Sequence, residues 1–197
     1  GWKDENGVEV NSGRMNLGVV TVNLPRIALE SEGDMNKFWE IFNERMNIAE
    51  DALVYRVERT KEATPANAPI LYQYGAFGRR LGKEESVDQL FKNRRATISL
   101  GYIGLYEVAT VFFGNSWESN PEAKEFTLDI IRDMKRRVEE WSDQYGYHFS
   151  IYSTPSESLT DRFCRLDTEK FGSIPDITDK EYYTNSFHYD VRKNPTP

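Results

Sequence analysis

The stretch HFSIYSTPSESLTDRFC, from His148 to Cys164, decides the fold class, because an apolar strand there breaks into a hydroxyl-rich loop and restarts as a helix. The hydroxyl donors of this loop are Ser153, Thr154, Ser156 and Ser158, and Pro155 stiffens the turn. Free N–H groups open the following helix and carry partial positive charge, so the layout suits a phosphate. The alternative is a plain helix cap, since Thr154 and Glu157 have capping-box spacing. On these residues alone the pattern favours capping.

Composition predicts one globular domain. The chain has 197 residues, of which 39% are hydrophobic and 13% aromatic, with a net charge of −7. That charge argues against a broad nucleic-acid surface and leaves room for a local phosphate pocket. No apolar run reaches the roughly 20 residues that a membrane span needs. The single cysteine, Cys164, excludes an internal disulfide and a cysteine-rich metal site within these residues, and predicts a reducing, cytoplasmic location.

Strands and amphipathic helices alternate along the chain. The predicted strands cover Gly18 to Leu24, Ile70 to Tyr74, Ala96 to Tyr102 and the run that starts at His148. The predicted helices run from Asp34 to Val57, from Ser86 to Phe91, from Leu105 to Phe112 and from Asn120 to Trp141. Phe171 to Asp179 is predicted as loop and Tyr182 to Val191 as a final extended segment. This alternation is typical of parallel βαβ units, in which ligands bind at the carboxyl ends of the strands.

A few single residues have both a chemical and a structural interpretation. Asn16 has an amide suited to a pocket, although the Asn, Ser and Gly residues just before it favour a turn. Glu107 could be a pocket carboxylate, but the helix dipole explains an acid in a first turn better. His148 is interpreted as a satisfied or exposed histidine and Cys164 as a buried small residue. The Lys135-Arg136-Arg137 run is predicted to be a solvated helix face.

Four motifs, taken together, favour the chemical interpretation of several of these residues. They are GRMNLGVVTVNLPR from Gly13 to Arg26, ISLGYIGL from Ile98 to Leu105, YSTPSESL from Tyr152 to Leu159 and YTNSFH from Tyr183 to His188. In this order they resemble the anaerobic, class III ribonucleoside-triphosphate reductases. The resemblance runs from about Asn11 to the last residue. Four motifs in order are far more specific than any one of them.

The resemblance implies an α/β fold that is part of a ten-stranded α/β barrel of the glycyl-radical enzyme and ribonucleotide reductase type. In such enzymes a cysteine thiyl radical abstracts the ribose 3′-hydrogen, and formate is the usual reductant. The family's thiyl cysteine lies upstream of the GRxN motif, and its glycyl radical and four-cysteine structural zinc site lie near the C-terminus. Residues 1–197 are therefore expected to be a partial catalytic barrel domain, a fragment that is inactive alone. Cys164 is no substitute for the missing cysteine.

The resemblance also implies roles for particular residues. Asn16 matches the active-site asparagine, which can hydrogen-bond the ribose hydroxyls or formate. The substrate phosphate is expected at Ser153, Thr154, Pro155, Ser156, Glu157 and Ser158, with Glu157 mainly a capping residue. Candidate pocket residues in the YTNSFH motif are Asn185, Ser186 and His188. No metal ligand is predicted within this chain.

The implied partners are a ribonucleoside triphosphate, a radical-SAM iron–sulfur activating enzyme and a second copy in a homodimer, without nucleic acid or membrane. Two alternatives stay open. One is another glycyl-radical enzyme with a non-nucleotide substrate, and the other is a non-catalytic nucleotide-binding module. A barrel fragment would have unpaired strand edges and is expected to be poorly soluble when expressed alone.

Overall fold

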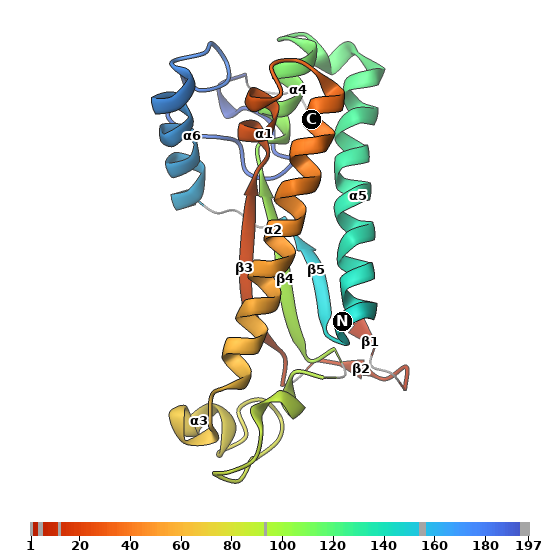
Figure 1. Cartoon of the computed structure of the whole chain (residues 1–197), viewed down its shortest axis with the longest axis vertical. Coiled ribbons are helices and arrows are strands. Elements are labelled where there is room, and N and C mark those ends of the chain that lie inside the picture. The colour runs from red at the N-terminus through yellow and green to blue at the C-terminus, as the bar shows by residue number, and fades with distance from the viewer. Residues whose placement is uncertain (1, 4–5, 12, 93, 154–156, 194–197) are drawn as a thin grey trace. The chain divides into compact units, whose positions relative to one another are not determined.

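The computed structural model describes residues 2–3, 6–11, 13–92, 94–153 and 157–193 and has a mixed α/β fold (Figure 1). Its strands are β1 (Trp2–Lys3), β2 (Glu9–Val10), β3 (Met15–Asn23), β4 (Ala96–Ile103) and β5 (His148–Tyr152). Its α-helices are α1 (Leu24–Glu30), α2 (Met35–Lys61), α3 (Pro69–Tyr72), α4 (Leu105–Phe113), α5 (Pro121–Tyr145) and α6 (Glu157–Phe171). Short 3-10 turns cover Pro65–Asn67, Val87–Leu90, Trp117–Ser119 and Val191–Lys193.

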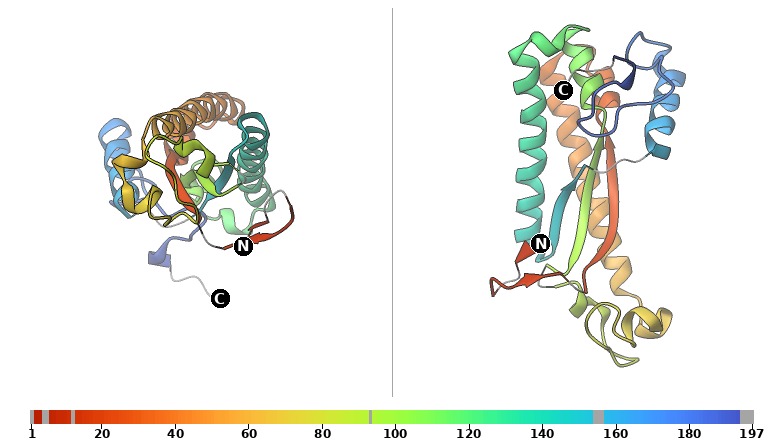
Figure 2. Two further views of the ribbon diagram at one scale, coloured as in Figure 1. Left: turned by 90° about the horizontal axis from the view of Figure 1, so that it is seen from below. Right: turned by 180° about the vertical axis from the view of Figure 1, so that it is seen from behind.

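The main sheet has the order β3-β4-β5, and its three strands run parallel, as the arrows in Figure 1 and the rear view in Figure 2 show. Parallel neighbours need long crossovers, and helices supply them here: α1 and α2 lie between β3 and β4 in the sequence, and α4 and α5 between β4 and β5. A separate antiparallel pair joins β1 and β2. The predicted α/β class and the three strands of this sheet are confirmed.

The chain divides into two compact units. Unit 1 comprises Gly1–Val20, Glu50–Leu100 and Lys135–Ile151, and unit 2 comprises Thr21–Ala49, Gly101–Met134 and Tyr152–Pro197. Each strand of the main sheet begins among the residues of unit 1 and ends among those of unit 2. The carboxyl ends of the strands, where parallel sheets bind ligands, therefore belong to unit 2.

The core of each unit follows the apolar stripes that the sequence predicts. In unit 1, Leu53 and Val57 of α2 and Trp141 of α5 are buried, and the Trp141 ring meets Phe149 edge-on at 6.0 Å between centroids. In unit 2, Phe38 stacks on Phe42 at 5.9 Å and meets Phe126 edge-on at 5.3 Å, which puts the stripes of α2 and α5 together. Asp34 caps α2 as predicted, because its Oδ1 accepts from the Asn36 N–H at 2.8 Å.

Helix α1 is absent from the sequence prediction, which had only Pro25 ending a strand. Asn23 ends β3 and caps α1, with its Oδ1 accepting from the Arg26 N–H at 3.1 Å. Pro25 lies in the first helical turn, where a missing N–H costs nothing. Gly104, at the turn into α4, has φ +85°, and a Cβ there would lie 2.2 Å from the Cγ of Pro25. The close approach of α1 and α4 thus requires glycine at this position.

Two predicted segments are wrong. Ile70 to Tyr74 is not a strand, because Pro69–Tyr72 forms the short helix α3. Tyr182 to Val191 is not extended: among the described residues its β-contact is an isolated antiparallel bridge between Ile103 and Asn185, and Ser186 has φ +47°. Positive φ is incompatible with a continuing strand, so the segment turns back on itself. None of the described helices is long and apolar enough to cross a membrane.

Candidate functional site

The carboxyl end of β5 carries Ser153, the first residue of the predicted phosphate loop. Its Oγ donates to the Tyr102 hydroxyl on β4 at 2.9 Å, and burial raises the pKa of that phenol. The next three loop residues, Thr154, Pro155 and Ser156, lie outside the described residues. Helix α6 begins at Glu157, and Ser158 is exposed in its first turn. The phosphate-loop assignment therefore stays a prediction, with one end fixed to β4.

The carboxyl end of β4 is covered by the YTNSFH motif. The Gly104 N–H donates to the Thr184 carbonyl at 2.9 Å, and the Leu105 N–H donates to the Ser186 carbonyl at 3.1 Å. Between these two bonds, Asn185 forms the antiparallel bridge with the last residue of β4. The structure thus brings two of the candidate pocket residues, Asn185 and Ser186, directly to the end of a strand.

From Asn185 to His188 the motif forms a tight turn. Ser186 is 1% exposed, and its Oγ has no hydrogen-bond partner among the described residues. Phe187 is 67% exposed and stacks on the exposed His188 ring, with centroids 5.2 Å apart. The His188 N–H donates to the Asn185 carbonyl at 2.8 Å and closes the turn. The three candidate pocket residues therefore lie in one compact turn of unit 2.

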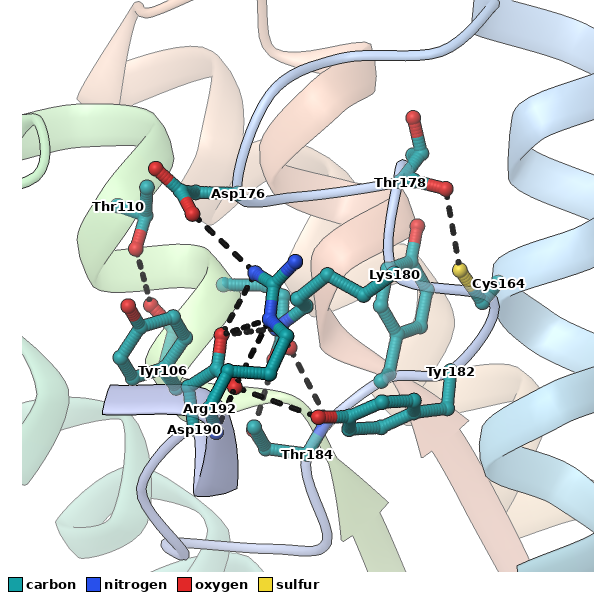
Figure 3. A network of polar contacts seen from close by, with 12 residues as sticks. Tyr106, Thr110, Cys164, Asp176, Thr178, Lys180, Tyr182, Thr184, Asp190 and Arg192 are labelled. Carbon is teal, nitrogen blue, oxygen red and sulfur yellow. Dashed lines mark hydrogen bonds and ion pairs between the residues drawn. The ribbon is translucent and has the colours of Figure 1, made fainter. Parts of the chain in front are cut away.

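A buried ion pair lies under this turn. Lys180 and Glu107 are fully buried and form a salt bridge, and the Lys180 Nζ lies 4.7 Å from the centroid of the Tyr106 ring (Figure 3). Glu107 Oε1 also accepts from the Thr184 N–H at 3.0 Å, and Oε2 accepts from the Thr184 hydroxyl at 2.8 Å. The helix-dipole interpretation of Glu107 is therefore incomplete: it lies in the first turn of α4, but as a buried, paired carboxylate.

The network continues to the end of the described chain. Asp190 is buried, lies 3.7 Å from the Lys180 Nζ and accepts from Arg192 at 2.8 Å, while Arg192 also reaches Asp176 at 3.2 Å (Figure 3). The Tyr182 hydroxyl donates to Asp190 at 3.3 Å. Burial alone would raise the pKa of Asp190, but hydrogen bonds from Arg192 and the charge of Lys180 outweigh it and lower the pKa to about 2.

The carboxyl end of β3 is tied to the same segment through Asp167 of α6. This buried carboxylate accepts from the Asn23 amide at 3.1 Å and from the Tyr183 hydroxyl at 2.7 Å, and it pairs with Arg26. Burial, together with the negative charge of Asp167, raises the pKa of Tyr183, so its phenol remains a donor. Tyr183 and Thr184 are therefore held by two separate buried carboxylates.

Asn16 lies in unit 1, on β3 rather than in a turn. It is exposed, and its Oδ1 accepts from the Gly18 N–H at 2.9 Å. This local bond fixes the amide, which has two further N–H donors of its own. Asn16 and the candidate residues of the YTNSFH motif belong to different units.

Cys164 and two basic features behave as the sequence predicts. The thiol is fully buried, donates to the Thr178 carbonyl at 3.5 Å, and has a pKa raised to about 11 by burial. Lys135 is 68% exposed, in agreement with a solvated helix face. His148 is half-buried beside a cavity of about 620 Å³ in unit 1 that Arg94 also lines. Within the described ranges, no three His, Cys, Asp or Glu side chains gather as metal ligands would.

Sequence reasoning missed the charged residues that hold the site, Asp167, Lys180, Asp190 and Arg192. They sit in ordinary charged stretches, and no spacing rule distinguishes a buried lysine from an exposed one. The available signal was that Glu107 lies in the first helical turn after a buried strand, close to the carboxyl end at which ligands of parallel sheets bind.

Comparisons with known proteins agree on one family. The family model described as anaerobic ribonucleoside-triphosphate reductase matches residues 3–197. The Escherichia coli K12 anaerobic ribonucleoside-triphosphate reductase is 48% identical over the whole of this chain, and the phage T4 enzyme is 47% identical. The chain spans 28% of the length of the first relative and 31% of the second.

Solved structures give the same answer. A structure of the Thermotoga maritima anaerobic ribonucleotide reductase with citrate in the active site matches 89% of this chain and 30% of its own, with a TM-score of 0.68 and 26% identity. A structure of that enzyme in complex with dATP and CTP matches 87% of this chain and 28% of its own, with a TM-score of 0.66 and 28% identity. The chain belongs to the anaerobic ribonucleoside-triphosphate reductase family.

Proposed function

We propose that this chain is part of the catalytic subunit of an enzyme that reduces ribonucleoside triphosphates to 2′-deoxyribonucleoside triphosphates. In this proposal β3, β4 and β5 are three neighbouring strands of a ten-stranded barrel completed by residues outside these 197. A glycyl radical, a thiyl cysteine and a structural zinc site also lie outside them, formate is the reductant, and a radical-SAM iron–sulfur enzyme activates a homodimer. Cys164 has no part in the radical step of this proposal, because its thiol is fully buried and donates to the Thr178 carbonyl.

One observation supports the proposal most strongly. The YTNSFH motif, which the sequence shares with the family, is fixed to the carboxyl end of β4 by backbone bonds from Gly104 and Leu105. Buried carboxylates at Glu107 and Asp167 hold its first two residues. Polar groups placed this firmly at a strand end are typical of a binding site and not of a surface loop.

In this proposal each predicted residue has a distinct role. The Asn16 amide donates to the ribose hydroxyls or to formate and so orients them for hydrogen abstraction. The loop from Ser153 to Ser158 receives the substrate phosphates with hydroxyl groups and with the N–H groups that open α6. Asn185, Ser186 and His188 line the pocket. The radical chemistry is supplied by groups outside this chain, and the residues here bind and orient the substrate.

The test uses the longer enzyme that contains this chain, activated and supplied with formate and a ribonucleoside triphosphate. We expect formation of the deoxyribonucleotide, and a loss of about 10²-fold in kcat for Asn16→Asp, since one well-placed donor is worth that much in other enzymes. Asp keeps the acceptor for the Gly18 N–H and removes the amide donors. Asn11→Asp, at an exposed position of unit 1, is the matched control and should retain full turnover.

Two results would count against the proposal. If the activated wild-type enzyme reduces no ribonucleoside triphosphate, the assigned reaction is wrong, and a non-nucleotide substrate or a purely binding role becomes the better hypothesis. If turnover occurs but Asn16→Asp matches wild type, Asn16 is a backbone-bonding residue and not a catalytic one.

A further inference from the structure

Glu107 makes more contacts with the segment from Lys180 to Asp190 than neutralisation of its charge requires. Its two carboxylate oxygens bind the Lys180 ammonium, the Thr184 N–H and the Thr184 hydroxyl, the last two at 3.0 and 2.8 Å. Both sides of the salt bridge are fully buried. One carboxylate on α4 thus fixes two positions of the segment that runs from Lys180 to Asp190.

Lys180 fixes a third position. Its ammonium lies between Glu107 and Asp190, the latter 3.7 Å away, and above the rings of Tyr106 at 4.7 Å and Tyr182 at 5.6 Å. In the sequence, Lys180 precedes the YTNSFH motif and Asp190 follows it, and both side chains are buried. The motif is therefore a loop closed at its base by buried charges.

The backbone hydrogen bonds of Thr184 and Ser186 depend on the buried charges of Glu107, Lys180 and Asp190. Thr184 is the residue that Glu107 holds, and its carbonyl accepts from the Gly104 N–H at 2.9 Å. Two residues later, the Ser186 carbonyl accepts from the Leu105 N–H at 3.1 Å. Because Asn185 lies between these bonds, a shift of Thr184 moves every candidate pocket residue.

We propose that Glu107 and Lys180 are positioning residues that hold Asn185, Ser186 and His188 at the carboxyl end of β4 in the geometry that substrate reduction requires. The inference rests on the proposed function. It adds two residues that touch no reacting atom and act through Thr184. A stability role alone makes a different prediction, because a buried pair replaced by neutral groups of similar size is often tolerated by the fold.

The experiment compares Glu107→Gln, Lys180→Met and the double variant in the longer, activated enzyme. Each single variant leaves a buried charge without its partner, so we expect lower thermal stability and at least a tenfold loss of kcat. The double variant removes both charges and should recover most of the thermal stability. We expect its kcat to stay at least tenfold below wild type, because Glu107 accepts the two Thr184 bonds with different oxygens and the amide of Gln has only one acceptor oxygen. Recovery of kcat together with stability would overturn the inference.

Amide hydrogen exchange gives a readout that needs no turnover. In Glu107→Gln and in the double variant, the amides of Gly104, Leu105 and Thr184 should exchange at least tenfold faster than in wild type. Glu140→Gln breaks an exposed ion pair with Arg136 on α5 and is the control, with exchange and kcat expected to be unchanged. Unchanged exchange at the three amides overturns the inference even in an active enzyme. If these amides exchange faster in the variants but the wild-type enzyme reduces no ribonucleotide, Glu107 and Lys180 do hold the loop, and the proposed function is wrong.

Discussion

The two units of the chain bury very different chemistry. Among the described residues, buried polar and charged side chains concentrate in unit 2, where Glu107, Asp167, Lys180 and Asp190 are all enclosed, whereas unit 1 encloses only Ser99. Two long-range polar contacts of unit 1 instead join a phenol to a carboxylate that is not enclosed. The Tyr145 hydroxyl donates to Glu50 at 2.8 Å, and the Tyr147 hydroxyl donates to Asp88 at 2.7 Å.

This difference separates a scaffold from a site. Enclosing a charge costs free energy unless it is paired and hydrogen-bonded, so a fold that needed only stability would use apolar groups in those positions. Unit 1 has this composition, since its enclosed positions other than Ser99 hold no polar or charged residue among those described. Unit 2 departs from it in the segment that binds the ends of β3 and β4, which is where a ligand-binding α/β protein requires fixed geometry.

The largest expected effect is the loss of a lysine from unit 2. Lys180→Ala leaves Glu107 and Asp190 buried without their shared cation, and we expect a destabilisation of about 3–5 kcal/mol. The matched change in unit 1 is Lys92→Ala, which removes an ammonium 4.0 Å from the centroid of the Tyr147 ring and should cost about 0.5–1 kcal/mol. The urea dependence of hydrogen exchange in α4 and in β5 reports the two values separately. Equal costs would remove the distinction between the units.

The same contrast explains how far the sequence could predict the fold. The apolar stripes of α2 and α5, the capping of α2 by Asp34 and the apolar runs of β3 and β4 are local patterns, and the structure has each of them. Helix α1 was missed because only seven residues form it and Pro25 was interpreted as a strand end. The strand predicted at Ile70 to Tyr74 was wrong because a short apolar run fits a buried turn of helix equally well.

The site was predictable only in part. The motifs gave Asn185, Ser186 and His188, and the structure brings these three together in one turn. Lys180 could not be predicted, because its burial depends on a carboxylate 73 residues earlier in the chain. The periodicity of apolar residues carries no information on ion pairs between residues so far apart in the sequence. A lysine among charged residues is normally exposed to solvent. The extended segment predicted from Tyr182 fails for the same reason, since tertiary hydrogen bonds fold it into a loop.

A second, smaller effect tests how tightly unit 2 is packed. Gly104→Ala adds a Cβ 2.2 Å from the Cγ of Pro25 at a residue with φ +85°, and we expect a loss of about 2–4 kcal/mol from strain and overpacking together. Gly78 in unit 1 has a similar φ of +81°, but its nearest contact for a Cβ is 3.5 Å away. Gly78→Ala should therefore cost about 1 kcal/mol, from backbone strain alone. Thermal unfolding of both variants measures the difference, and a Gly104→Ala cost no larger than that of Gly78→Ala would show that Pro25 gives way easily.

The smallest effect concerns pH, and here the units should respond in separate ranges. Burial lowers the pKa of His148 from its usual 6.5, and the nearby charges of Arg94 and Arg14 lower it further. The unfolded chain takes up this proton first as the pH falls, so unit 1 loses stability below about pH 6.5, and the loss ends once the folded histidine is also protonated. Asp190 of unit 2 has its pKa lowered from 3.8 to about 2, so the stability it contributes is present above pH 3.8 and is lost as the pH falls from there through about 2.

The two titrations can be separated with one substitution. Between pH 7 and pH 5, His148→Gln should flatten the loss of stability in unit 1, as measured by hydrogen exchange in β5, and should leave the exchange of α4 unchanged. Gln keeps polar groups at this position and has no proton to gain in that range. An equal slope in wild type and variant would mean that the half-buried imidazole is protonated as easily in the folded chain as in the unfolded one. In that case burial beside Arg94 would not be what distinguishes the acid response of unit 1, and the contrast between the units would rest on the buried network around Lys180 alone.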